Sequence, residues 1–154
     1  MIYEAKLGLT THFLGGYKKG KDGIRRVKMT YSGQVALNES ELRNHFQLAA
    51  KQLEMEFNPK TVVFAEGFDS ELSIIRRVYN KTNIEFFEGI EQGETINIEM
   101  AVVGDEDKIP TQDDLSKILN VIGKFYGISQ FGNKFQCGRF KVITIVRKTK
   151  DNYG

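Results

Sequence analysis

The chain has 154 residues, 40% hydrophobic and 27% charged, with a formal net charge of +2, which is the composition of an ordinary globular protein. The length suits one domain, 1–154, with a sizeable core, and the apolar stretches are far shorter than the roughly 20 residues of a membrane span. No signal peptide begins at residues 1–4, and the single cysteine, Cys137, cannot form an internal disulfide, so we expect a cytoplasmic protein without a membrane partner.

The first part of the chain alternates between strand patterns and a basic loop. Residues 2–9 alternate roughly between apolar and polar side chains, which predicts a strand. Residues 14–23 hold four glycines and three lysines and therefore predict a flexible basic loop. Residues 24–31 and 34–37 again have the pattern of strands, with a possible break between them.

A helix and a hairpin are expected next. Asn38 followed by Glu41 is typical of a helix N-terminus, and apolar residues then recur at helical spacing, so we predict a helix over 39–57. His45 lies off its apolar stripe and is interpreted as a surface residue. After a short buried strand at 61–65, residues 71–79 and 83–88 are compatible with a hairpin inside an insertion at 71–90.

The second half of the chain repeats the strand–helix–strand pattern. Residues 94–103 alternate cleanly, which predicts a half-buried strand. Residues 110–114 start a second helix, whose apolar stripe is Leu115, Ile118, Leu119, Ile122 and Phe125. A glycine-rich loop at 126–138 leads to a last strand at 139–147, whose centre is apolar on both faces, as in a well-covered strand.

This order predicts an α+β fold. Two strand–helix–strand units in one chain match the ferredoxin-like (RRM-like) βαββαβ plan, here with extra strands. Both helices would then cover one face of the sheet. The other face, or its rim, would remain available for a ligand or another subunit.

Charge is distributed unevenly along the chain. Residues 1–35 hold seven Lys or Arg against two acids, and residues 124–150 hold seven and no acid. Residues 36–123 hold eight basic and seventeen acidic residues. If the two ends fold side by side, they form a one-sided positive field for a polyanion. The alternative is that the basic side chains only solvate strand faces.

The glycine-rich loop and its flanks combine features of a single-strand groove. Lysines and arginines can pair with phosphates, and Tyr126, Phe131, Phe135 and Phe140 could stack on bases, although Phe140 is expected in the core. We therefore predict binding of single-stranded nucleic acid, RNA rather than DNA. The candidate contacts are Lys18, Lys19, Lys21, Arg25, Arg26, Lys124, Gly132, Lys134, Gly138, Arg139 and Lys141.

The segment that ends Gly138-Arg139-Phe140-Lys141-Val142, after the second helix, resembles the glycine-rich loop of the RAMP superfamily of CRISPR repeat-associated RNA-binding proteins. The resemblance covers roughly residues 94–147. It implies ferredoxin-like domains that grip guide RNA, with contacts at Gly132, Gly138 and Arg139, and in some members RNA cleavage without metal. Gly132 and Gly138 stand further apart than is usual in that loop. The same ending also resembles small bacteriophage proteins.

His12 is the candidate catalyst, because a histidine beside a basic loop could move the proton of a ribose 2′-hydroxyl in a metal-independent ribonuclease. The alternative is a structural or merely exposed histidine. Phosphate-binding Walker loops, Gly-x-Ser-x-Gly and Cys-x-x-Cys are absent from the sequence, which disfavours a common enzyme. His12, His45 and Cys137 have no metal-ligand spacing, so we expect neither a metal nor a cofactor.

Other functions remain open at this stage. The acidic middle could serve a protein–protein module, such as a bacteriophage inhibitor of host defence or a structural component that binds a host or phage protein. Basic ends could also pair with the acidic middle of a second copy, which would give a homo-oligomer. The basic, glycine-rich loops could instead hold a small phosphorylated ligand.

Overall fold

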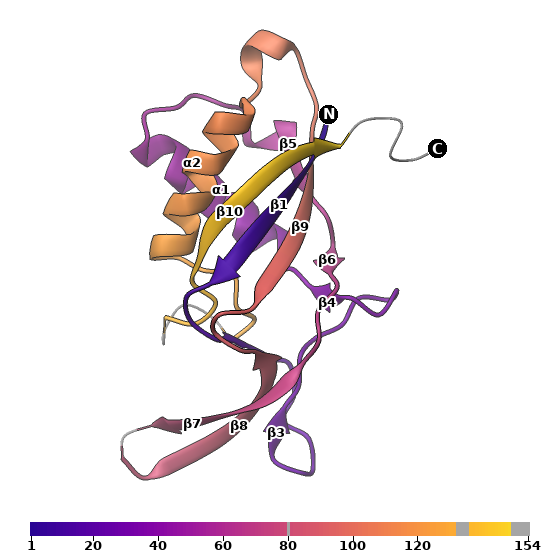
Figure 1. Ribbon diagram of the computed structural model, residues 1–154, viewed down its shortest axis with the longest axis vertical. Helices are drawn as coiled ribbons and strands as arrows, with labels where there is room; N and C mark the ends of the chain where they lie inside the picture. The colour runs from indigo at the N-terminus through magenta and orange to yellow at the C-terminus, as the bar shows by residue number, and fades with distance from the viewer. Residues whose placement is uncertain (80, 132–135, 149–154) are drawn as a thin grey trace.

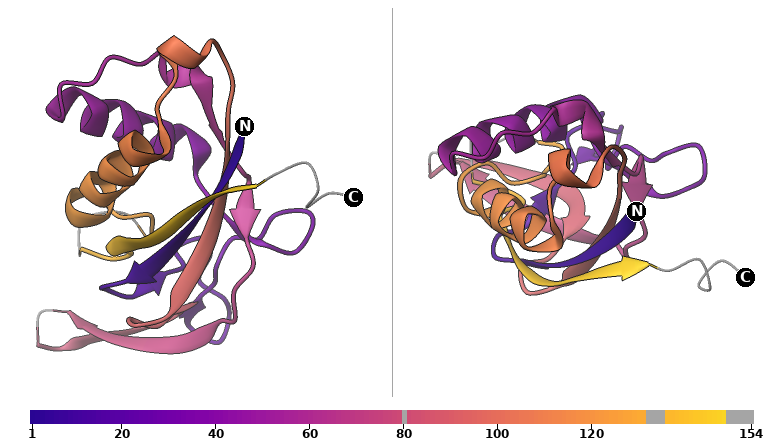
Figure 2. Two further views of the ribbon diagram at one scale, coloured as in Figure 1. Left: turned by 45° about the horizontal axis from the view of Figure 1, so that its top comes forward. Right: turned by 90° about the horizontal axis from the view of Figure 1, so that it is seen from above.

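The computed structural model describes residues 1–79, 81–131 and 136–148, which form a mixed α+β architecture (Figure 1). Two helices pack on one face of an antiparallel sheet, and a long hairpin extends from one end of this body (Figures 1 and 2). The α+β class predicted from the sequence is confirmed. No helix among the described residues is long and apolar enough to cross a membrane.

The main sheet is built from four segments that are far apart in the sequence. Its strand order is β10-β1-β9-β5, and every neighbouring pair is antiparallel. The predicted strands at 2–9, 61–65, 94–103 and 139–147 agree with the observed ones within one residue at each end. The strands are β1 (Ile2–Leu9), β5 (Val62–Phe64), β9 (Thr95–Val102) and β10 (Phe140–Lys148).

The helix face of the sheet carries the core. Alternation along β9 buries Ile96, Ile98, Met100 and Val102, as predicted, because only one face of the strand is covered. α2 (Gln112–Phe125) buries the stripe Leu115, Ile118, Leu119 and Ile122 against this face. Its predicted start is confirmed by a capping box between Thr111 and Asp114. The last residue of the predicted stripe, Phe125, is 53% exposed, so it lies outside the core.

α2 approaches β10 closely through Gly123. A Cβ atom at this position would lie 2.1 Å from the carbonyl oxygen of Phe140, so the contact requires a glycine. Phe140 itself is buried, as expected.

α1 spans Glu39–Gln52, so the predicted start is right and the predicted end at residue 57 is wrong. The helix terminates in a Schellman motif: Met55 N–H donates to the Ala50 carbonyl at 2.8 Å, and Glu54 N–H donates to that of Lys51 at 3.0 Å. Glu54 takes the left-handed conformation, with φ of 57°. Met55 and Phe57 continue the helical spacing in sequence, but they pack against the core after the chain has turned.

The sheet face opposite the helices is open. Ile143 and Val146 on β10 are 45% and 57% exposed, so the prediction that this strand is covered on both faces is wrong. β10 is an edge strand that pairs only with β1 among the described strands. Val142 and Ile145 of its apolar centre pack against the core, whereas Ile143 and Val146 are exposed on the side away from the helices. Lys148 closes part of this face by binding Glu4 at 3.0 Å and Glu99 at 2.5 Å, and these hydrogen bonds raise the pKa of Lys148.

The hairpin predicted around residues 80–83 is confirmed, although residue 80 lies outside the described range. β7 (Ser73–Tyr79) and β8 (Asn83–Ile90) pair antiparallel, and β8 also pairs with β2 (Phe13–Leu14) and, in parallel, with β3 (Ile24–Arg25). A small cluster of Leu14, Ile75, Phe87 and Cys137 attaches the hairpin to the body.

The strands predicted over 24–31 and 34–37 are largely wrong. They reduce to β3 and to β4 (Val35–Ala36), which pairs with β6 (Gly67–Phe68). Most of the segment from Arg26 to Gln34 follows the surface as a loop with a turn at 30–33, because its backbone bonds to other loops rather than to a long neighbouring strand. Two short 3-10 helices, Pro59–Thr61 and Glu106–Lys108, complete the described elements.

Candidate nucleic-acid interface

The basic N-terminal segment and the glycine-rich loop lie side by side. Phe131 N–H donates to the Leu14 carbonyl at 3.0 Å, and the Ser129 hydroxyl both accepts from Leu14 N–H and donates to its carbonyl, each at 2.8 Å. A Cβ atom on Gly16 would lie 2.9 Å from the Cα of Phe131, which measures how close the two backbones are. Segments more than 100 residues apart in the sequence thus form one surface.

Gln130 fastens the start of the loop to residue 28. Its Oε1 accepts from Lys28 N–H at 2.7 Å, while its Nε2 donates to the carbonyls of Lys28 and Ala36, both at 2.9 Å. Both N–H donors and one oxygen lone pair of this amide are therefore used within the protein, and Gln130 acts as a positioning residue.

The end of the loop packs on the link between β1 and β2, which precedes the basic segment. Gly138 N–H donates to the His12 carbonyl at 2.7 Å, and the Thr11 hydroxyl accepts from Arg139 N–H at 2.8 Å. Gly138 has a φ of 65°, and a Cβ atom there would lie 2.5 Å from Ser129 N. The sequence indicated Gly138 as a nucleic-acid contact, but the residue is buried and its backbone is used for internal packing.

The two predicted arginines of the N-terminal segment are paired with the protein's own carboxylates. Arg25 lies 3.5 Å from Glu85, and Arg26 lies 3.4 Å from Glu88 and 2.5 Å from Asp22. The pKa of the Asp22 carboxyl is lowered, chiefly because it accepts the backbone N–H of Ile24, with Arg26 adding to the effect. These pairs offset much of the positive charge on this part of the surface.

Lys19 also faces a carboxylate, that of Glu85 at 3.9 Å. Lys21 is exposed, and no ion pair to it is found among the described residues. The sequence shows that the N-terminal segment is basic, but it does not show that the acidic strand β8 runs beside this segment.

Tyr17 forms an exposed aromatic position with two lysines. Its ring is 56% exposed, and the ammonium groups of Lys18 and Lys28 lie 5.8 and 5.9 Å from the ring centroid. No carboxylate pairs with either lysine among the described parts of the chain. A cation beside an aromatic face is attracted by the ring quadrupole, so the two charges stay close to a surface on which a base could stack.

This position opens into a cleft of about 520 Å³ between the two segments and the N-terminus of α1. One wall carries Gly16, Tyr17, Lys28 and Gln130, and the other carries residues 36–41. A volume of several hundred cubic ångströms is typical of small-ligand sites, and one nucleotide would fit. The cleft thus has a basic aromatic wall and an acidic wall at the start of α1.

The remaining predicted contacts are dispersed. Lys124 lies 5.4 Å from the Phe125 ring, and Arg139 donates from Nη1 to the Lys124 carbonyl at the end of α2. Lys141 covers Gly8 on the open face of the main sheet, away from the helices. Gly132 and Lys134 lie outside the described residues.

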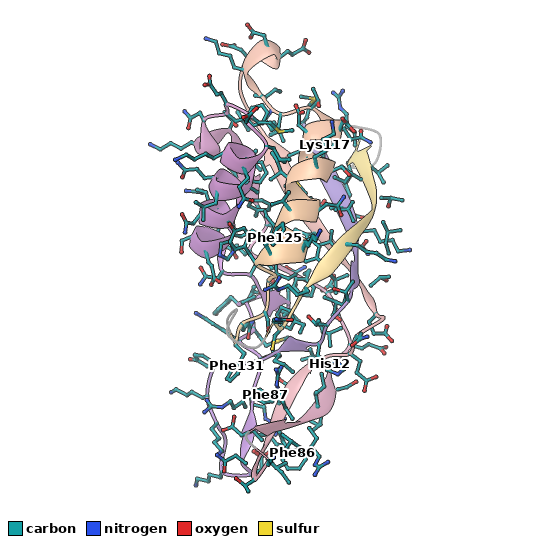
Figure 3. All side chains as sticks on the ribbon, turned by 90° about the vertical axis from the view of Figure 1, so that its left-hand side faces the viewer. His12, Phe86, Phe87, Lys117, Phe125 and Phe131 are labelled. Atoms are coloured by element: carbon teal, nitrogen blue, oxygen red, sulfur yellow. The ribbon has the colours of Figure 1, made fainter. Side chains whose placement is uncertain are left out.

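The predicted stacking aromatics are mostly used internally. Tyr126 stacks on His45 with ring centroids 4.5 Å apart, and Phe131 packs edge-on against Phe87 at 4.8 Å (Figure 3). Phe135 lies outside the described residues. Sequence reasoning missed Tyr17 and Lys28 as site residues. The adjacent pairs Gly15-Gly16 and Lys18-Lys19 around Tyr17 were the available signal, because an aromatic between glycines and lysines has no strand pattern to bury it.

The two histidines lie in different settings. His45 was interpreted as a surface residue, but it is only 7% exposed because Tyr126 covers its ring, and this burial lowers its pKa while Glu41 opposes the shift. His12 is exposed, and its Nδ1 accepts the backbone N–H of Gln92 at 2.9 Å. A neutral imidazole that accepts at Nδ1 carries its proton on Nε2, so the Gln92 contact occupies the lone pair of this ring.

Metal ligands do not gather anywhere in the described residues: no group of three or more His, Cys, Asp or Glu side chains could hold an ion. Comparison with known proteins adds no identification, since no protein-family model matches the chain and no curated protein is significantly similar to it.

Proposed function

We propose that the main sheet and its two helices form a ferredoxin-like domain. The strand order β10-β1-β9-β5, with α1 following β1 and α2 following β9, supports this assignment. The hairpin β7–β8 and the short strands around residues 13–36 are then additions to that plan. They supply the surface on which the candidate site is built.

The function that the site supports best is binding of single-stranded nucleic acid, RNA rather than DNA, without catalysis. The observation that carries the proposal is the exposed Tyr17 ring, which lines the cleft and has the ammonium groups of Lys18 and Lys28 at 5.8 and 5.9 Å from its centroid. A base can stack on the ring while the two ammonium groups contact the flanking phosphates. The open sheet face contributes less, because the aromatic residues Tyr3 and Phe140 of its strands are buried on the helix side.

Fluorescence anisotropy with a labelled RNA decamer at several salt concentrations tests the proposal. Tyr17→Ala should weaken binding about 5- to 150-fold, because stacking on one aromatic contributes about 1–3 kcal/mol. Lys18→Ala and Lys28→Ala should each reduce the slope of log affinity against log salt by about 0.7. Lys60→Ala, at the opposite end of α1, is the matched control and should leave both quantities unchanged. Affinity that does not depend on salt, or equal losses in the control, would contradict the proposal.

A second candidate function is contact with a protein. The outer face of the hairpin exposes apolar side chains around Arg76: Ile74, Val78, Ile84 and Phe86, each more than 40% exposed. Phe86 points away from the body in Figure 3. Apolar residues around an arginine are typical of interface centres, and they fit a partner with apolar side chains around a carboxylate. The two functions involve different surfaces, so they are separable by mutation.

A pull-down from nuclease-treated lysate distinguishes this candidate. A specific protein partner should be captured by the wild type and lost with Phe86→Ser or Arg76→Glu. Phe125→Ser, which removes an exposed aromatic from α2 instead, should retain it. A partner that is retained by all three variants would argue against the hairpin as the interface.

A further inference from the structure

We assign phosphate binding to the basic wall of the cleft. The acidic wall that faces it has no role in that contact. Glu39 and Glu41 lie in the first turn of α1 and both line the cleft. Glu39 is bound to Arg43 at 2.5 Å, one turn further along the helix, so much of its charge is neutralised. Glu41 has no cationic partner among the described residues and also lines the small cavity that continues toward His45.

The Glu41 carboxylate keeps free acceptor capacity beside its contact with Asn38. Its Oε2 accepts one long hydrogen bond, 3.3 Å, from the side-chain amide of the helix cap Asn38. For Oε1 no hydrogen bond is found within the described residues. The neighbouring Ser40 hydroxyl donates to Asn38 Oδ1 at 3.0 Å and keeps its own lone pairs for a ligand. This wall therefore offers a ligand several hydrogen-bond acceptors and few donors.

A base that enters the cleft meets these acceptors with its edge when its face lies on Tyr17. Guanine presents two adjacent donors, N1–H and the 2-amino group, which match the two oxygens of a carboxylate. Adenine and cytosine present one amino donor beside a ring acceptor, and uracil presents one donor between two carbonyl acceptors. A wall that offers mainly acceptors favours the first arrangement and disfavours the adjoining acceptors of the others.

We propose that the cleft selects guanine, with Tyr17 under the base, Lys28 at the phosphate and the Glu41 carboxylate at the Watson–Crick edge. This inference rests on the proposed binding of single-stranded nucleic acid and adds a base preference to it. Gln130 has no N–H left to donate to a base, because Lys28 and Ala36 accept both. Selection comes from the start of α1, a part of the chain in which sequence reasoning placed no site residue.

The experiment compares three labelled RNA decamers in fluorescence anisotropy at low salt. One is all uridine, the second has two central guanosines, and the third has inosine at those two positions. The guanosine decamer should bind about tenfold more tightly than the uridine decamer, within the range that a bidentate contact supplies. Inosine lacks the 2-amino group and should lose most of this advantage.

Two variants assign the preference to its residue. Glu41→Gln keeps an oxygen for the Asn38 side-chain amide and leaves the backbone cap by Asn38 in place, but it replaces one acceptor by a donor, so the protein should fold normally and lose the guanosine preference. Glu56→Gln, at the other end of α1, should retain it, and thermal unfolding of both variants checks that they are folded. Equal binding of the guanosine and uridine decamers by the wild type would overturn the inference while leaving the proposed function standing.

A guanosine preference that survives in Glu41→Gln would also overturn the inference, because the carboxylate would then not be the reader. If none of the three decamers binds at low salt, the proposed function itself fails, and the base preference fails with it. The failure of the specific inference is thus distinguishable from the failure of nucleic-acid binding.

Discussion

The side-chain amide of Gln130 holds the backbone of Lys28 with a pair of hydrogen bonds, 2.7 and 2.9 Å long, across 102 residues of sequence. A third bond, to the Ala36 carbonyl, fixes the segment that leads into α1. The glycine-rich loop, the basic segment and the start of α1 therefore keep their relative positions through one side chain.

Removal of the Gln130 amide should loosen the cleft. Gln130→Ala leaves the Lys28 N–H and the Ala36 carbonyl without their partner, while the Lys28 carbonyl still accepts the Ala36 N–H, so we expect a loss of about 1–2 kcal/mol in the free energy of unfolding. RNA affinity should fall as well, although Gln130 touches no ligand. Urea denaturation and anisotropy measure the two effects. Gln92→Ala, whose side chain has no described hydrogen bond, is the control and should change neither.

Gly123→Ala should destabilise the protein even though alanine is the better helix former. The added methyl group would stand 2.1 Å from the Phe140 carbonyl oxygen and force α2 away from β10. We expect a loss of at least about 2 kcal/mol, which exceeds the gain of about 1 kcal/mol from helix propensity. Gly93→Ala is a useful comparison, because nothing lies within 4 Å of its Cβ position and only its φ of 95° is strained. Urea denaturation should rank Gly123→Ala as the more damaging substitution.

Local patterns predicted the elements that have one buried face and clear ends. β9 alternates residue by residue, and the capping box of Thr111 and Asp114 marks the start of α2, so both were found. The end of α1 was missed because a Schellman turn at Glu54 forms it. The left-handed conformation of this turn usually carries a glycine, so a glutamate at this position gives no signal in the sequence. The exposure of the centre of β10 was missed because it depends on which elements pack on this strand, and the residues of β10 do not show this.

The sequence left open whether the two basic segments meet. Their backbones lie side by side at residues 14–16 and 129–131, but Lys124, Arg139 and Lys141 do not join the N-terminal lysines. Sequence separation hides that Glu85 and Glu88 of β8 lie beside Arg25 and Arg26. The remaining site is smaller and is centred on Tyr17, which belongs to no periodic pattern of apolar residues in the sequence. Long-range pairing, rather than composition, decides which charges are left for a ligand.

His45 should make stability depend on pH near neutrality. Burial lowers its pKa in the folded protein, from the ordinary value of 6.5, so below about pH 6.5 the unfolded chain takes up a proton that the folded chain resists. Stability should therefore be greatest above pH 7 and fall as the pH drops toward 5.5. His45→Gln should flatten this fall in urea denaturation at pH 7.5 and 5.5. An unchanged difference between the two pH values would assign the effect to other groups.

His12 should prove dispensable for any action on RNA. Because its Nδ1 accepts the Gln92 N–H at 2.9 Å, the ring holds its proton on Nε2 and has no free lone pair with which to remove the proton of a ribose 2′-hydroxyl. Incubation of labelled RNA with the wild type in EDTA should give no cleavage above that of a protein-free sample. His12→Ala should bind RNA with wild-type affinity, since the imidazole lies outside the Tyr17 cleft. Cleavage by the wild type that disappears in His12→Ala would instead establish this histidine as a catalyst and require the Gln92 contact to open during the reaction.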